Sequence, residues 1–223
     1  MKKTYQNKII VETKEFRPKP QYPTYPPYHK GYYLEESFFN YFNKNNVELD
    51  RIYIPIFWTN CYNNNWYNKI STSSIQDYLN TLDPDLKYFT ICQHERAPLE
   101  KLPKNTLIFI SSGKISENND SNNIIPIPLI CSKIPKPNKN KKRDIFCSFI
   151  GSNTHEIRTK LYDQLKNDEK YYIEMDKWDL NISETKTANF KNIMERSLFS
   201  LCPRGNGPTS FRLYEAMQLG SIP

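Results

Sequence analysis

The stretch that most constrains what this chain can fold into lies at its C-terminal end. A short apolar run, Leu198–Cys202, alternates large and small side chains and predicts a buried strand. The cluster Pro203–Pro208 follows and is rich in residues that break regular structure. Thr209 or Ser210 can then N-cap a helix, and Gly220 supplies the left-handed residue that ends it. The pattern predicts a strand, a glycine loop and a helix.

This arrangement predicts an anion-binding loop. The backbone N–H groups of the first helical turn point into the loop, where the helix dipole favours negative charge. Arg204 lies in the loop and Arg212 lies one turn into the helix, so two guanidinium groups can bind one phosphate-like anion. Glu215 falls on the same helix face and suits ribose hydroxyls. Alternatively, Arg212 and Glu215 form only an exposed helical pair, which contributes about 0.2–0.5 kcal/mol.

The terminal motif also resembles a known family. The pattern Cys-Pro-Arg-Gly-x-Gly-x-x-Ser-x-Arg-Leu-x-Glu-Ala-x-x-x-Gly-x-Ile-Pro, over residues 202–223, is similar to the signature of the exostosin family of glycosyltransferases. The resemblance implies an α/β protein of the GT-B type, with two Rossmann-like domains built on parallel sheets and the nucleotide-sugar held by the C-terminal one. It also implies inverting transfer of a sugar from a nucleoside diphosphate, for which we expect UDP, to a carbohydrate hydroxyl. No metal or other cofactor is expected.

A second segment shares this resemblance. Asp144–Gly151 predicts a strand that is followed by a helix from about His155, and it resembles the exostosin element Phe-x-Gly followed by Arg. Arg158 is therefore expected to border the diphosphate, although the alternative of a solvated surface residue stays open. The donor-binding residues that we expect from the two segments are Gly151, Arg158, Arg204, Gly205, Asn206, Gly207, Ser210, Arg212 and Glu215.

The same half of the chain predicts a parallel sheet. Between the two segments, Tyr171–Met175 predicts a strand and Thr187–Glu195 a helix, so strands and helices alternate and right-handed crossovers are expected. The chain stops at Ile222-Pro223, where the next strand of the family is expected to start. A half-built sheet leaves an apolar edge. We therefore expect an incomplete C-terminal domain, either from a fragment of a longer protein or completed by another chain.

The N-terminal half is expected to form the acceptor-side domain. Residues 1–28 carry little periodicity, and Arg17–Tyr28 is rich in proline and tyrosine, which predicts an extended arm. Apolar spacing predicts a helix over 31–44, whereas the Asn-rich segment Asn60–Asn68 predicts a loop. The further expected elements are a helix at 73–82 and strands at 51–57, 87–93, 106–111 and 123–129.

Two candidate catalytic residues follow the strand predicted at 87–93. His94 and Glu95 emerge at its C-terminal end, where α/β sheets place their ligands. The position resembles the His-containing strand end in the acceptor domain of exostosins, and either side chain is a candidate base for the acceptor hydroxyl. Alternatively, they form a surface pair. Asp83-Pro-Asp85 matches the DxD pattern of metal-dependent transferases of another fold, but here it predicts a turn.

Composition bounds the domains and the partners. The charged run Lys133–Arg143 predicts a basic linker, so we expect an arm at 1–29, an acceptor-side domain at 30–132 and a donor domain at 144–223. The net charge of +7 permits an anionic partner. We expect a UDP-sugar and a glycan acceptor rather than nucleic acid. The sequence carries no signal peptide and no apolar run of about 20 residues, which favours a cytoplasmic protein.

Two other interpretations stay open. An inactive or truncated relative would bind the nucleotide-sugar without transferring the sugar. A basic RNA-binding protein would use the run Lys133–Arg143. The five cysteines include no CxxC pair, which argues against a metal site and against a closed disulfide framework.

Overall fold

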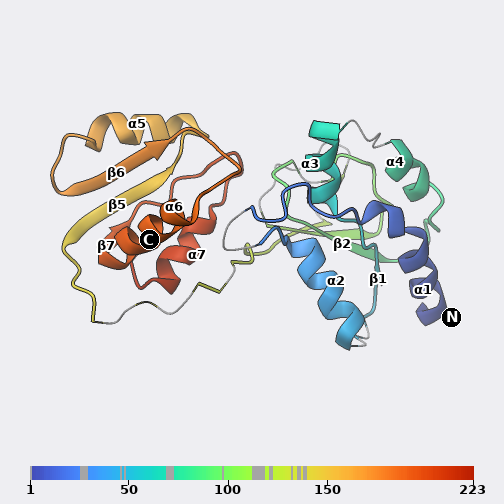
Figure 1. The fold of residues 1–223 in the computed structure, drawn as a ribbon. Coiled ribbons are helices and arrows are strands. Elements are labelled where there is room, and N and C mark those ends of the chain that lie inside the picture. The colour runs from blue at the N-terminus through green and yellow to red at the C-terminus, as the bar shows by residue number, and fades with distance from the viewer. Residues whose placement is uncertain are drawn as a thin grey trace. The chain divides into compact units, whose positions relative to one another are not determined.

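The chain forms two compact units, each built on a parallel sheet (Figure 1). The computed structural model describes residues 2–25, 30–45, 47, 49–68, 73–96, 98–111, 119–120, 123–131, 133–134, 137 and 140–223. Unit 1 comprises Met1–Pro23 and Tyr32–Leu129, and unit 2 comprises Thr24–Gly31 and Ile130–Pro223. The predicted α/β class with parallel sheets is confirmed. The proline-rich arm is divided between the units, because Thr24–Gly31 belongs to unit 2.

The sheet of unit 1 contains four parallel strands in the order β1-β2-β3-β4. In the inner strand β2, Tyr88 pairs with Ile52 of β1 on one side and with Thr106 of β3 on the other. The elements of this unit are α1 (Lys2–Glu12), a 3-10 turn η1 (Lys14–Phe16), α2 (Leu34–Asn45), β1 (Ile52–Tyr53), α3 (Trp58–Asn68), α4 (Ser73–Leu79), β2 (Tyr88–Cys92), β3 (Thr106–Ile110) and β4 (Ile124–Pro126).

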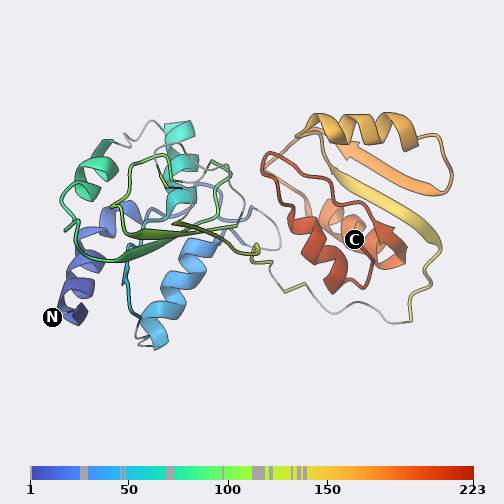
Figure 2. The same cartoon turned by 180° about the vertical axis from the view of Figure 1, so that it is seen from behind.

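The two faces of this sheet bury different sets of side chains, because neighbours along a strand point to opposite faces. On one face, the Phe38 ring of α2 lies 5.1 Å from the ring of Tyr53 and 5.9 Å from that of Phe89. On the other face, α1, α3 and α4 cover a core that includes Ile9 and Trp58. Figures 1 and 2 show α2 and α3 on opposite sides of the sheet.

Helix α1 is not predicted by the sequence, because its apolar residues do not recur at helical spacing. Its position depends on a contact with β1. The side-chain amide of Gln6 donates to the Tyr53 carbonyl at 2.9 Å and accepts the Tyr53 N–H at 2.7 Å. The amide therefore satisfies backbone groups at the open edge of the sheet, while Ile9 is fully buried.

The loop expected at 60–68 is wrong, since Trp58–Asn68 forms helix α3. Asparagine favours turns because its side chain competes for nearby backbone groups. In α3 the Asn60 amide instead donates to the Pro18 carbonyl at 3.0 Å and to Oε1 of Glu36 at 2.9 Å. Because a distant segment and α2 occupy this side chain, it does not compete with the helical backbone.

The sheet of unit 2 contains three parallel strands in the order β6-β5-β7. The crossovers from β5 to β6 and from β6 to β7 run in opposite directions across the sheet, so right-handed connections put α5 and α6 on opposite faces (Figures 1 and 2). Ile222 forms an isolated parallel bridge with Phe199 of β7. The elements of this unit are β5 (Ile145–Ser152), α5 (Glu156–Leu165), β6 (Tyr171–Asp176), α6 (Glu184–Arg196), β7 (Ser197–Ser200) and α7 (Phe211–Gln218).

The basic run Lys133–Arg143 is described only in part, since residues 135, 136, 138 and 139 lie outside the described ranges. Ile134 is 3% exposed in the core between α6 and α7, and its N–H donates to Oε1 of Gln218 at 2.9 Å. Arg143 donates to the Ser197 carbonyl at 2.6 Å. These residues of the run are therefore anchored to unit 2 rather than solvated.

No helix within the described ranges is both long enough and apolar enough to cross a bilayer.

Candidate functional site

The loop between β7 and α7 is fastened by Arg158 of α5. Its Nε donates to the Arg204 carbonyl at 2.9 Å, and its Nη2 donates to the Pro203 carbonyl at 3.2 Å. Its Nη1 donates to the Ser152 carbonyl at 2.9 Å. Arg158 is buried rather than solvated. Its guanidinium thus ties the loop backbone to the end of β5.

Arg212, in the first turn of α7, is a buried cation whose hydrogen bonding is incomplete. Its Nη2 donates to the Ile150 carbonyl at 2.5 Å, and its guanidinium carbon lies 4.7 Å from the centroid of the Phe149 ring. Its Nε and Nη1 have no hydrogen-bond partner among the described residues. A Cβ added to Gly151 would overlap Nη2 of Arg212, so a side chain there would displace this guanidinium. A buried cation with unmet donors is costly unless an anion binds it.

Glu215 lies three residues after Arg212 and is buried to the same extent, with 9% of each residue exposed. The alternative of an exposed helical pair is therefore wrong. Burial raises the pKa of Glu215 to about 7, with the Arg212 cation opposing the rise. Such a carboxyl group exchanges its proton near neutral pH and can both donate to and accept from hydroxyl groups.

This carboxyl group gives unit 2 a stability that depends on pH. The folded chain keeps the Glu215 proton up to about pH 7, whereas the unfolded chain releases it above its ordinary pKa of 4.5. The free energy of unfolding should therefore fall as the pH rises between these values. Relative to a Glu215→Gln variant, we expect wild type to lose about 3 kcal/mol over this window, measured by urea denaturation. A difference that stays constant from pH 4 to pH 8 would contradict this assignment.

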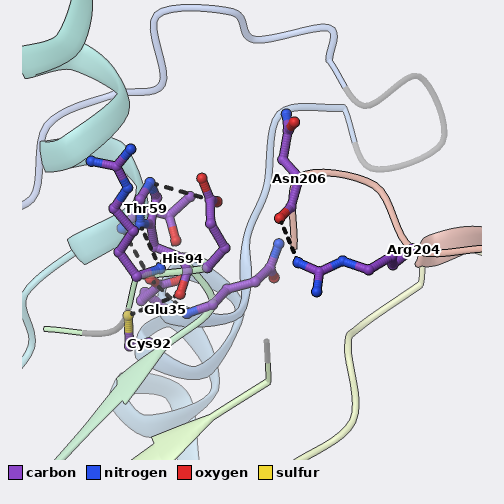
Figure 3. A network of polar contacts seen from close by, with 9 residues as sticks. Glu35, Thr59, Cys92, His94, Arg204 and Asn206 are labelled. Atoms are coloured by element: carbon purple, nitrogen blue, oxygen red, sulfur yellow. Dashed lines mark hydrogen bonds and ion pairs between the residues drawn. The ribbon is translucent and has the colours of Figure 1, made fainter. Parts of the chain in front are cut away.

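The remaining loop residues surround these two groups. Arg204 is exposed, and its Nη2 donates to the Asn206 carbonyl at 3.1 Å (Figure 3). A Cβ at Gly205 would lie 3.0 Å from Nη2 of Arg158, so the loop passes very close to that guanidinium. Ser210 is the N-cap of α7, but its side chain makes no capping hydrogen bond. The predicted donor-binding residues thus gather around this loop: Gly151, Arg158, Arg204, Gly205, Asn206, Gly207, Ser210, Arg212 and Glu215.

In unit 1, His94 and Glu95 lie just after β2, as the sequence predicts. Figure 3 shows His94 near Cys92, the last residue of that strand. Nδ1 of His94 accepts the Arg96 N–H at 3.3 Å, and Nε2 lies 3.7 Å from Oε2 of Glu95. Burial lowers the pKa of His94, with Glu95 opposing this shift. A neutral imidazole whose Nδ1 accepts a hydrogen bond carries its proton on Nε2. That proton faces the Glu95 carboxylate, which is the more exposed of the two side chains.

A buried carboxyl group that the sequence does not point to lies at the same strand end. Oε1 of Glu35, in α2, accepts from the Thr59 hydroxyl at 2.7 Å and from the Gln93 N–H at 3.2 Å (Figure 3). Burial raises the pKa of Glu35, with the Thr59 hydrogen bond opposing the rise. The only signal in the sequence is an acidic first helical turn, which the helix dipole already explains. Glu35 ties α2 and α3 to the segment that carries His94.

Residues 89–223, more than half of the chain, match the Exostosin GT47 domain. The chain belongs to the exostosin GT47 family. The match includes the strand end at His94 as well as the loop between β7 and α7. This exostosin chain is also 32% identical over 108 residues to a probable glucuronosyltransferase of Oryza sativa subsp. japonica. The similarity covers 43% of this chain and 23% of that relative, so the chain matches less than a quarter of the relative's length.

The Asp-Pro-Asp segment of this exostosin chain lies outside the family match and forms a turn. The N–H of Asp85 donates to Oδ1 of Asp83 at 3.0 Å. In the parts of the chain that the structure describes, no three His, Cys, Asp or Glu residues are grouped as metal ligands would be. Catalysis without a metal stays a prediction.

Proposed function

We propose that this chain carries a glycosyltransferase site that moves a sugar from a UDP-sugar to a carbohydrate hydroxyl with inversion. The observation that supports this most is the Arg212 guanidinium, which is buried at the start of α7 and has two nitrogens without a partner among the described residues. A cation held in this way is prepared for the charge that develops on a departing diphosphate. In this proposal Glu215, three residues further along α7, binds the ribose hydroxyls.

In the proposed reaction, the acceptor oxygen forms a bond to the anomeric carbon while the bond from that carbon to the diphosphate oxygen breaks. The electron pair of the broken bond stays on UDP, where Arg212 and the first turn of α7 stabilise it. The hydroxyl proton passes to Glu95. We favour Glu95 over His94 because the imidazole presents an N–H, and not a lone pair, to the neighbouring carboxylate. His94 then acts as the positioning residue.

The name of the rice relative suggests the first donor to test. That protein is described as a probable glucuronosyltransferase. UDP-glucuronic acid is therefore the first UDP-sugar to try, with other UDP-sugars beside it and oligosaccharides as acceptors. UDP affinity is measured by calorimetry, turnover by UDP release, and the anomeric configuration of the product by NMR. Absence of UDP binding would refute the proposal, and binding without turnover on any acceptor would indicate an inactive relative.

The base is tested with the isosteric variant Glu95→Gln. Because a general base contributes roughly 100-fold or more, we expect kcat to fall by about 100-fold while UDP affinity stays at the wild-type value. The variant Asp85→Asn is a control, since Asp85 lies in an exposed turn. Equal kcat in the Glu95→Gln variant and wild type would remove Glu95 from the reaction.

A further inference from the structure

Tyr25 of the N-terminal arm belongs to unit 2, which carries the loop between β7 and α7. Thr24–Gly31 groups with unit 2, although Pro23 before it and Tyr32 after it belong to unit 1. Tyr25 is partly buried there. Apart from this short segment near the start of the chain, unit 2 consists of Ile130–Pro223. Neither the terminal motif nor its spacing points to this residue.

The neighbour of Tyr25 is the indole of Trp178, in the segment after β6. The two ring centroids lie 6.2 Å apart with an angle of 75° between the planes. Such an edge-to-face pair is a favoured aromatic geometry. Trp178 remains 39% exposed. The pair therefore offers an open aromatic surface, of the kind on which a nucleobase can stack.

The phenol of Tyr25 also interacts with the charged groups around the β7–α7 loop. Burial raises the pKa of Tyr25, while the hydrogen-bonding indole of Trp178 and the cations of Arg158 and Arg212 oppose the rise. The charge of the Glu215 carboxyl group, in contrast, raises the pKa of the same phenol. The phenol thus keeps its proton at neutral pH. Its partner Trp178 follows β6, whose last residue Asp176 pairs with Ser152, the residue whose carbonyl accepts from Arg158. The ring pair therefore lies at the end of the sheet that carries the proposed diphosphate site.

We propose that Tyr25 is a nucleotide-binding residue that the N-terminal arm supplies to this site. Its hydroxyl donates a hydrogen bond to a phosphate oxygen, and its ring forms, with Trp178, the aromatic wall beside the nucleoside. The inference rests on the proposed function, because it requires a nucleoside diphosphate at Arg212. It assigns to the proline-rich arm a part in donor binding.

The test compares UDP and inorganic pyrophosphate as calorimetric probes of the full chain. Tyr25→Phe removes only the hydroxyl and should weaken the binding of both probes by roughly 5–10-fold. Tyr25→Ala also removes the ring and should weaken UDP by roughly 50-fold, which is more than its effect on pyrophosphate. Tyr32→Phe is the matched control, because Tyr32 is a 55% exposed tyrosine of unit 1 that lies just after the arm, and this variant should bind UDP as wild type does.

The outcomes separate this inference from the proposed function. Suppose that wild type binds UDP, that the Arg212→Met variant does not, and that Tyr25→Phe and Tyr25→Ala bind UDP as tightly as wild type. The inference about Tyr25 is then overturned, and the proposed function stands. Tighter binding by Tyr25→Ala would also overturn it, since Tyr25 would then occupy the place of the nucleotide. If wild type does not bind UDP at all, the proposed function fails and this inference fails with it.

Discussion

Replacing Arg212 with methionine is expected to weaken UDP binding by roughly 1,000-fold, because two charge-assisted hydrogen bonds of about 2 kcal/mol each are lost. Methionine keeps an unbranched side chain against the Phe149 ring and removes the guanidinium, including its Nη2 contact with Ile150. Since the native cation is buried with two unmet donors, the free protein gains little stability from it. The affinity is measured by calorimetry, and the melting temperature is measured on the same samples.

The control for this result is another arginine of unit 2. Arg196 donates to the Asp144 carboxylate through Nε at 2.8 Å and through Nη2 at 2.6 Å. These two nitrogens are therefore already paired with an anionic side chain. Arg196→Met should bind UDP with the wild-type affinity. If Arg196→Met and Arg212→Met weaken UDP binding equally, the loss reflects the overall charge of the protein, and the assignment of Arg212 to the UDP site is wrong.

Replacing Phe149 with alanine is expected to lower the free energy of unfolding by about 3–5 kcal/mol. Phe149 is fully buried in β5, and the guanidinium carbons of Arg158 and Arg212 lie 5.7 and 4.7 Å from its ring centroid. The variant leaves a cavity under both cations and removes a cation–π partner from each. Urea denaturation followed by circular dichroism measures this loss.

A second phenylalanine of β5 provides the control for Phe149→Ala. Phe146, three residues earlier in β5, is 47% exposed. Phe146→Ala should cost clearly less than Phe149→Ala, because a side chain that remains half in water leaves no closed cavity. Equal losses in the two variants would mean that the Phe149 ring does not support the two guanidinium groups.

Local pattern was sufficient for most of unit 2. The terminal motif predicts a strand, a loop and a helix, and β7, α7 and the left-handed Gly220 (φ 76°) follow that order. The order of these elements and the left-handed glycine follow from residue type and spacing along the chain. The predicted burial of the strand is wrong, since Leu198 and Phe199 of β7 are 42% and 39% exposed, and Ser210 makes no capping hydrogen bond. The burial of Arg212 could not be read in this way, because an arginine on an amphipathic helix has the same local pattern whether it is solvated or covered.

The errors in unit 1 have a common cause. Helix α1 depends on the Gln6 amide at the edge of β1, and α3 remains helical because distant groups occupy the Asn60 side chain. In each case a polar side chain whose partner is far away in sequence decides the local structure. Propensity describes asparagine and glutamine in water, so it fails where a hydrogen bond to another segment replaces the water.

The sequence by itself determined the family signature, the α/β class and the loop before α7, because these follow from residue type and spacing. Only the tertiary structure decided how the hydrogen bonding of the two buried arginines differs. Arg158 has its donors on three carbonyls of the loop and β5, whereas Arg212 keeps two nitrogens without a partner among the described residues. The physical reason is that hydrogen-bond satisfaction depends on which backbone groups folding brings within about 3 Å, and spacing along the chain does not encode that distance.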